Sequence, residues 1–342
     1  METAYVYHPI YLEHNQPSHP ENARRLERIR ATLDEQGLLE RLRLLEPRPA
    51  THTELRRVHA QQHIQRVQDV SETGGGYLDP DTYVSEKSFQ AAVMAAGGVV
   101  RAVEGVLEGE IANAFALVRP PGHHATHGRG MGFCLFNNVA VAARAALARQ
   151  EIERVFIADF DVHHGNGTAD TFASDPHVLF FSTHQYPYYP GTGAKNDMGH
   201  GAGAGTTLNV PLPTNVGDDG YGRIYDALVW PLVARFNPDL ILVSAGYDAH
   251  WDDPLAHMGL SLTGFAAMSR ELVAMADGLC AGRLVLTLEG GYQLDTLACG
   301  VLNAFYALLK EETVVDPLGP SPRPEPSIDG LIEDLRTLHQ LS

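Results

Sequence analysis

The 342-residue sequence predicts an α/β fold, a single three-layer domain in which a mostly parallel central sheet lies between layers of helices. From about residue 111 onward, short apolar runs alternate with segments of helical period, a pattern typical of parallel sheets. The runs are rich in β-branched and aromatic residues and lack polar alternation, as expected of strands covered on both faces. With 44% hydrophobic and 20% charged residues, the chain can build a substantial core.

Five strands are predicted, and each is followed at once by residues of unusual chemistry. The strands are AFALV (114–118), VFIA (155–158), VLFFS (178–182), LILVSA (240–245) and LVLTL (284–288). In parallel α/β sheets, sites form at the carboxyl ends of the strands. We therefore expect the five segments that follow these strands to converge on one crevice.

Five longer helices are predicted from the spacing of apolar residues. They span residues 19–37, 85–109, 137–150, 221–236 and 262–278. Gly37 is suited to the C-cap of the first helix, and Thr263 is the predicted N-cap of the last.

The chain is expected to divide near residue 312. Residues 1–312 show no break in composition and are predicted to form one domain. Residues 313–342 form a tail, in which the proline-rich segment 317–326 precedes a predicted short helix at about 327–341.

The composition disfavours several classes of function. A formal net charge of −17 argues against direct binding of nucleic acid or anionic membranes. The chain lacks an unbroken apolar run of about 18 residues, and its start, METAYVYHPI, does not resemble a secretion signal, so a cytoplasmic location is expected. The spacing of Cys134, Cys280 and Cys299 predicts neither a disulfide framework nor a thiolate metal site.

The segment DFDVHHGNGT, which starts at Asp159, predicts half of a metal site. Asp161 and His163 are two residues apart, so on an extended backbone their side chains point the same way. Asp248, after another predicted strand, would add a second carboxylate and leave a coordination position open, as in catalytic Zn²⁺ sites. Fe²⁺ and Co²⁺ are alternatives because the set contains no sulfur. Taken singly, these residues are explained as well by a strand-capping pair and a turn aspartate.

A histidine pair and a tyrosine follow two other predicted strands. His123 or His124 could act as general base and then general acid beside a metal-bound water, with Asp159 as an acceptor that orients the partner ring. Tyr292, after two glycines, could donate a hydrogen bond to a developing oxyanion. Without their context, these side chains are equally well explained as surface histidines and a packed tyrosine.

Together, eight segments resemble the arginase–deacetylase superfamily, specifically histone deacetylases and bacterial histone-deacetylase-like amidohydrolases. The segments are HPENARRLERI, RPPGHHA, GFCLFNNVA, DFDVHHGNGT, THQYPYYPGTG, LNVPLP, SAGYDAH and LEGGY, between about His8 and Gly300. The resemblance implies a deacetylase catalytic domain over residues 1–312. It also implies zinc-dependent removal of acetyl or other acyl groups from acyl-lysine peptides or proteins, or from small acylated amines.

The resemblance also implies a role for individual residues. The zinc ligands would be Asp161, His163 and Asp248, and the catalytic set would be His124 (general base and acid), His123 paired to Asp159, Asn166 and Tyr292. The substrate-binding set would be Phe133 and Tyr189 (tunnel walls), Leu255 (rim), Arg25 (inner acetate channel), Gly290 and Gly291. A K⁺ site would use Asp159, Asp161, His163, Ser182 and Thr183, and a second monovalent-cation site Phe172, Asp175, Val178 and Thr206.

Details of the sequence bear on the subfamily and leave alternatives open. Asn166 replaces the aspartate of class I enzymes, which indicates a class II-like protein with a less basic His124. Leu255 stands where polyamine-selective relatives carry an acid, but Asp252 and Asp253 keep an acetylpolyamine amidohydrolase open. Arginase-like dimetal chemistry would need more carboxylates, and an acyl-ligand sensor would not need His124 and Tyr292. A homo-oligomer stays open, and His164 is expected to be structural.

Overall fold

The computed structural model describes residues 1–341, and its centre is an eight-stranded sheet with the order β2-β1-β5-β10-β9-β6-β7-β8. Every neighbouring pair of strands in this sheet is parallel. The strands are β1 (Thr3–Val6), β2 (Arg43–Leu45), β5 (Asn113–Ala116), β6 (Val155–Asp159), β7 (Val178–Gln185), β8 (Thr207–Leu212), β9 (Leu240–Ala245) and β10 (Leu284–Leu288). A separate antiparallel hairpin is formed by β3 (Gly76–Asp79) and β4 (Thr82–Val84).

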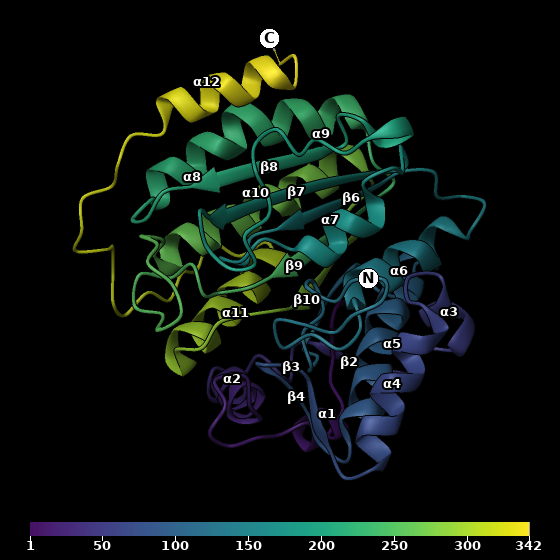
Figure 1. The fold of residues 1–342 in the computed structure, drawn as a ribbon. Coiled ribbons are helices and arrows are strands. Elements are labelled where there is room, and N and C mark those ends of the chain that lie inside the picture. Colours follow the sequence, from purple (N-terminus) through teal and green to yellow (C-terminus); the bar gives the residue numbers. More distant parts are fainter. Residues whose placement is uncertain (342) are drawn as a thin grey trace.

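Helices cover both faces of the sheet and complete three layers (Figure 1). α5 and α6 pack on one face, whereas α10 and α11 pack on the other, and α2 packs on α11. The α-helices are α1 (Ile10–Glu13), α2 (Arg24–Glu35), α3 (His52–Arg56), α4 (Gln61–Glu72), α5 (Ser88–Leu107), α6 (Asn138–Leu147), α7 (Asn166–Phe172), α8 (Asp218–Ile224), α9 (Trp230–Phe236), α10 (Leu262–Leu279), α11 (Leu294–Leu308) and α12 (Asp329–Leu338). A 3₁₀ turn, η1 (Gly201–Gly203), and a π-helical turn, η2 (Tyr225–Val229), complete the elements.

All five predicted strands are confirmed, as β5, β6, β7, β9 and β10, and all of their residues are buried. These five are consecutive neighbours within the sheet, in the order β5-β10-β9-β6-β7. Because they are all parallel, the segments that follow them leave the sheet at one edge. This arrangement is what brings the unusual residues together.

The predicted helices are also found, with two differences of detail. The N-cap of α10 is Ser261, whose hydroxyl accepts from the amide of Gly264, so the prediction of Thr263 was wrong. The predicted helix 221–236 contains the π-helical turn η2, which ends at Val229, two residues before Pro231. Pro231 has no N–H to donate to the preceding turn. Gly37 does follow α2 with a φ of 65°, as a C-cap glycine should.

The tail is consistent with its composition. Residues 313–328 contain neither helix nor strand, and α12 then packs on η2 with Ile332 and Leu335 buried. Ser342, the last residue of the predicted tail, lies outside the described residues. We keep the division at residue 312 as a proposal.

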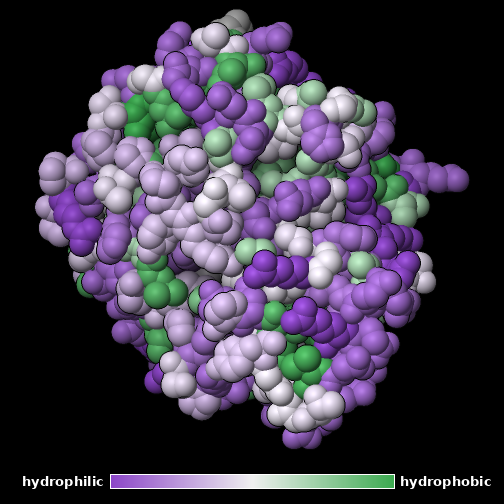
Figure 2. All heavy atoms as spheres, viewed as in Figure 1, coloured by the Kyte–Doolittle hydropathy of each residue, from purple (hydrophilic) through white to green (hydrophobic). Residues whose placement is uncertain are grey.

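The surface and the longest apolar helix bear on membrane contact. By length and composition alone, α5 could cross a membrane, but in this fold it is a core helix and most of it is buried. On the face shown in Figure 2, hydrophobic residues occur in small separate groups among hydrophilic ones.

A buried ion cluster joins the N-terminal region to the sheet. Glu21 is fully buried between Arg119, whose Nη2 lies 2.7 Å from Glu21 Oε2, and Arg25, whose Nη1 lies 3.2 Å from Oε1. The positive charge of Arg119 more than offsets the effect of burial and holds the pKa of Glu21 well below its ordinary value.

Glu21→Gln should therefore be strongly destabilising. Removing the carboxylate leaves two buried guanidinium groups without their counter-charge, and the free energy of unfolding should fall by about 3–5 kcal/mol. The measurement is equilibrium unfolding in urea, in which both proteins should show the same dependence of the free energy of unfolding on urea concentration. As a control, Asp295→Asn, which breaks an exposed ion pair with Arg28, should change the free energy of unfolding by less than about 1 kcal/mol. Equal effects of the two changes would contradict this account.

Candidate active site

Two carboxylates and one imidazole meet at the carboxyl end of the sheet. Asp161 and His163 follow β6, and Asp248 follows β9, its neighbour in the sheet. His163 Nδ1 lies 3.1 Å from Asp161 Oδ1 and 3.1 Å from Asp248 Oδ2, and the three donor atoms are all within 4.8 Å of one another. The three residues predicted to bind a metal are thus brought to one point.

Backbone amides fix the two carboxylates. Asp161 Oδ2 accepts from the amide of Gly290 at 2.8 Å, and Asp248 Oδ1 accepts from the amide of Val162 at 2.9 Å. These bonds orient the acids without a neighbouring arginine or lysine taking part in them. The donor set can therefore direct its remaining oxygen atoms toward a cation.

The surroundings fit a divalent metal. Although burial alone lowers the pKa of His163, its hydrogen bonds to Asp161 and Asp248 raise it to about 10, so the position strongly favours positive charge. Space is also kept free by a glycine, because a Cβ on Gly290 would lie 2.3 Å from Asp248 Oδ2 and 2.5 Å from Asp161 Oδ2. Oxygen and nitrogen donors suit Zn²⁺, Fe²⁺ and Co²⁺ alike.

A second buried group, His123, Cys134 and Glu289, also has donor atoms within 4.8 Å of one another. It is less suited to a metal, because burial raises the pKa of the Cys134 thiol well above its ordinary value. Glu289 instead accepts from the amides of Gly122 at 2.6 Å and His123 at 3.2 Å. It thereby anchors the loop of the histidine pair to the end of β10, a role that its place in LEGGY did not reveal.

The adjacent histidines His123 and His124 differ in charge. His123 Nδ1 lies 2.9 Å from Asp159 Oδ2, and although burial lowers the pKa of His123, the negative charges of Asp159 and Asp161 raise it to about 10. Burial and the charge of His123 lower the pKa of His124 well below its ordinary value. The surroundings thus favour the protonated form of His123 and the neutral form of His124.

The tautomer of His124 is set by its partner. Its Nδ1 lies 2.8 Å from the side-chain oxygen of Asn166, which can only accept, so Nδ1 carries the hydrogen. Nε2 is then unprotonated, and the ring lines a pocket that also includes His163. A neutral imidazole with a free nitrogen is the form that can take up a proton.

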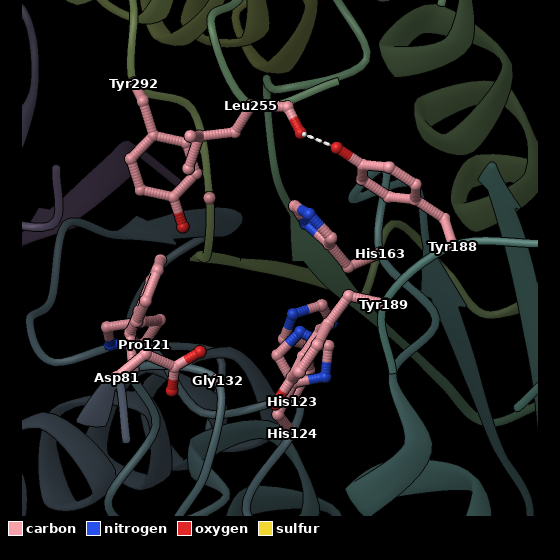
Figure 3. A pocket seen from close by; sticks show the side chains of 12 residues that line it. Asp81, Pro121, His123, His124, Gly132, His163, Tyr188, Tyr189, Leu255 and Tyr292 are labelled. Carbon is pink, nitrogen blue, oxygen red and sulfur yellow. Dashed lines mark hydrogen bonds between the residues drawn. The ribbon is translucent and has the colours of Figure 1, made fainter. Parts of the chain in front are cut away.

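His123, His124 and His163 line one pocket with a volume of about 260 Å³ (Figure 3). The hydroxyl of Tyr292 points into it, opposite His163 and the histidine pair. The lining residues are Asp81, Pro121, His123, His124, Gly132, Phe133, His163, Tyr188, Tyr189, Leu255, Gly290 and Tyr292. Phe133 and Tyr189 form aromatic walls, with the Tyr189 ring edge-on to His124 at 5.2 Å between centroids.

Two predicted substrate-binding residues do not line this pocket. Arg25 is fully buried, donates to the carbonyls of Gly291 at 2.7 Å and Glu289 at 2.5 Å, and lies over the Tyr292 ring. Gly291 contributes a backbone φ of 114°. Both therefore shape the segment that carries Tyr292, and their part in substrate binding stays a prediction.

Sequence reasoning missed four lining residues. Asp81 comes from the β3–β4 hairpin, which is far from the predicted strands and had no signal in the sequence. Tyr188 precedes the predicted wall residue Tyr189, stacks on His163 and donates from its hydroxyl to the Leu255 carbonyl at 2.9 Å (Figure 3). Pro121 and Gly132 were the other two, although they lie inside RPPGHHA and GFCLFNNVA. For these three, closeness in the chain to a predicted site residue was the signal.

Gly132 and Phe133 have an unusual backbone that places the Phe133 ring. Their φ values are 56° and 68°, and the second is uncommon for a bulky side chain. The amide of Phe133 donates to Thr82 Oγ1 at 3.1 Å, and a Cβ on Gly132 would lie 2.4 Å from His124 Cδ2. Glycine is therefore required there for the loop to approach the histidine.

The two predicted monovalent-cation sites have distinct surroundings. Asp159 and Ser182 are register partners in β6 and β7, next to Asp161, His163 and Thr183. At the other end of β7, the carbonyl of Asp175 is the acceptor for Val178 N and Thr206 Oγ1, each at 3.5 Å, and Phe172 lies under the guanidinium of Arg144. Both sites, and K⁺ itself, stay predictions.

Comparison with known proteins identifies the family. Residues 19–308 match the family model described as the histone deacetylase domain. The chain belongs to the histone deacetylase family.

Three relatives from different organisms are similar to most of the chain. It is 45% identical over 298 residues to a probable deacetylase of Archaeoglobus fulgidus, a match that covers 86% of this chain and 82% of that protein. It is 42% identical over 275 residues to the histone deacetylase-like amidohydrolase of Pseudomonas aeruginosa, covering 80% and 72%. It is also 40% identical over 320 residues to histone deacetylase 14, chloroplastic, of Arabidopsis thaliana, covering 89% and 76%.

The fold agrees with this assignment. The crystal structure of the HDA15 HD domain superposes with a TM-score of 0.90 at 36% identity, covering 99% of this chain and 94% of that one. The predicted arginase–deacetylase architecture is confirmed, and membership of the histone deacetylase family supports a deacetylase activity.

Proposed function

We propose that this histone deacetylase family member is a metal-dependent amidohydrolase that removes acetyl or other acyl groups from acyl-lysine peptides or related acylated amines. The observation that carries the proposal is one pocket lined by His163, His124 and Tyr292. His163 belongs to the donor set with Asp161 and Asp248, and the pKa of His124 is held well below its ordinary value. Family membership supports the reaction class.

Asp161, His163 and Asp248 would hold the metal. When bound, a divalent cation such as Zn²⁺ polarises the substrate carbonyl and lowers the pKa of water. Side chains carry out the proton transfers and stabilise the developing negative charge. His124 Nε2 takes the proton of the attacking water as the new C–O bond forms, and later gives it to the leaving amine as the C–N bond breaks. The Tyr292 hydroxyl donates a hydrogen bond to the carbonyl oxygen as negative charge develops on it.

The lining of the pocket supports an acyl-lysine-type substrate. Its aromatic walls, Phe133 and Tyr189, suit a flat amide on an aliphatic chain, and Asp81 and Leu255 also line it. The polyamine alternative loses part of its basis, because Asp253 is 6% exposed and its carboxylate accepts from three backbone amides. It is therefore not available to a cationic substrate, and only Asp252 is exposed there.

The direct test compares substrates on one metal-analysed preparation. Protein stripped of metal should be inactive on an acetyl-lysine peptide and regain activity with added Zn²⁺. Acetyl-lysine peptide should be hydrolysed faster than acetylspermidine. Equal or faster hydrolysis of acetylspermidine would favour the polyamine alternative, and no turnover of a broad acyl panel would favour a sensor. Localisation in the cytoplasm also stays a prediction, since two of the relatives are named chloroplastic.

Tyr292→Phe should lower kcat by about 10²–10³-fold, which is the usual cost of one oxyanion donor. KM and metal content should change little, because the ring and its contact with Phe133, at 5.9 Å between centroids, are kept. Steady-state kinetics with metal analysis is the measurement. Tyr77→Phe, at an exposed tyrosine, is the control. An unchanged kcat in the Tyr292 variant would remove the proposed oxyanion donor.

A further inference from the structure

The position of Tyr292 depends on more than its own stretch of chain. The residue comes after Gly290 and Gly291, and Gly291 has a φ of 114°, which glycine adopts readily and other residues rarely do. The tyrosine ring contacts Phe133 edge-on and lies under the Arg25 guanidinium at 5.1 Å, and the hydroxyl points into the pocket (Figure 3). The orientation of the side chain therefore depends on how its backbone is anchored.

The chain before the tyrosine is anchored by Arg25 and Asp161. Arg25 donates to the carbonyls of Glu289 and Gly291, and the amide of Gly290 donates to Asp161. These bonds fix the chain up to Gly291. They leave the amides of Tyr292 and Gln293 to another acceptor.

That acceptor is the buried carboxylate of Asp253. Its Oδ2 accepts from the amide of Tyr292 at 2.7 Å and from the amide of Gln293 at 3.1 Å. Burial and the charge of Asp248 raise the pKa of Asp253 to about 7, whereas the amide donors favour its ionised form, so the hydrogen bonds are strongest when the carboxylate is charged. They also hold the start of α11, since Gln293 is its N-cap.

The same carboxylate reaches the rim of the pocket. Asp253 Oδ1 accepts from the amide of Leu255 at 3.0 Å, while the Leu255 carbonyl accepts from the hydroxyl of Tyr188 at 2.9 Å. Tyr188 in turn stacks on His163, with 5.7 Å between ring centroids. A chain of contacts thus runs from Tyr292 through Asp253, Leu255 and Tyr188 to the candidate metal ligand.

We propose that Asp253 is a positioning residue that holds Tyr292 at the reacting carbonyl and ties it to the rim residue Leu255. This inference rests on the proposed function, because it assumes that the Tyr292 hydroxyl acts in the reaction. Asp253 itself touches neither substrate nor metal and acts through the backbone.

The test is a double-mutant cycle between Asp253→Asn and Tyr292→Phe. Asparagine keeps the shape of the side chain, but it has one acceptor oxygen where the aspartate has two, and it carries no charge. Asp253→Asn alone should lower kcat by about 10–10²-fold, the scale of a misplaced catalytic group, with KM and bound metal unchanged. In the Tyr292→Phe background it should lower kcat by less than about threefold, because no hydroxyl remains to be misplaced.

The matched control is Asp252→Asn. Asp252 is the exposed neighbour, and its substitution should leave kcat within about twofold. If Asp253→Asn lowers kcat by the same factor in both backgrounds, or does not lower it at all, the positioning role is overturned while the proposed function stands. If Tyr292→Phe itself has no effect, the proposed role of the tyrosine and this inference both fall.

A measurement on the unsubstituted holoenzyme covers the case in which Asp253→Asn does not fold. The amides of Tyr292 and Gln293 should exchange with deuterium far more slowly than unprotected amides, because both donate to a buried carboxylate. Exchange at the rate of free amides would overturn the proposal.

Discussion

Asp248→Asn should strip the protein of tightly bound metal and lower kcat/KM by at least about 10³-fold. The substitution removes one of the two carboxylates of the proposed metal-binding set and leaves His163 Nδ1 beside the single carboxylate of Asp161. A catalytic metal supplies several kcal/mol of transition-state stabilisation, and each 1.36 kcal/mol corresponds to a factor of ten in rate. Metal per chain and kcat/KM on an acetyl-lysine peptide should be measured on the same sample.

The control for this prediction is Asp34→Asn, which removes one exposed carboxylate on α2. It changes the net charge of the protein by the same amount but should leave metal content and kcat/KM unchanged. A full complement of metal in the Asp248 variant, with normal activity, would mean that this carboxylate is not a ligand. The proposed function would then lose the observation on which it depends.

The strands that position the site could be predicted because they are central in the sheet. β5, β6, β7, β9 and β10 are covered on both faces, so their sequences are continuous apolar runs. The missed strands carry weaker patterns. β2 is three residues long with an exposed leucine, and β8 includes Pro211, which edge strands tolerate.

The residues of the candidate site could be predicted where they come directly after a central strand. Asp161, His163, Asp248 and Tyr292 are placed in this way, and a parallel sheet necessarily gathers them at one edge. Asp81 and the function of Asp253 could not be predicted, because each depends on a turn whose path is set by tertiary packing. A short acidic segment such as WDDPL is usually solvated, and only the structure distinguishes the buried Asp253 from the exposed Asp252.

His124→Ala is the second substitution with a large expected effect, a fall in kcat of about 10²–10⁴-fold. In contrast to Asp248→Asn, it should leave the bound metal in place, because His124 is not in the donor set. Metal analysis alongside kcat therefore separates loss of the proton carrier from loss of the cation. His52→Ala, at an exposed histidine on α3, is the control and should leave kcat unchanged.

The pH dependence of the wild-type enzyme decides which of the two adjacent histidines carries the proton. The base must be unprotonated in the free enzyme, so kcat/KM falls as pH drops through its pKa. Burial and the charge of His123 hold the pKa of His124 well below its ordinary value, so activity should persist as the pH falls through the ordinary range for histidine. His123, with a pKa raised to about 10 by Asp159 against the effect of burial, would as base require strongly alkaline solution. A kcat/KM that rises only near pH 10, with His124→Ala still active, would transfer the role to His123.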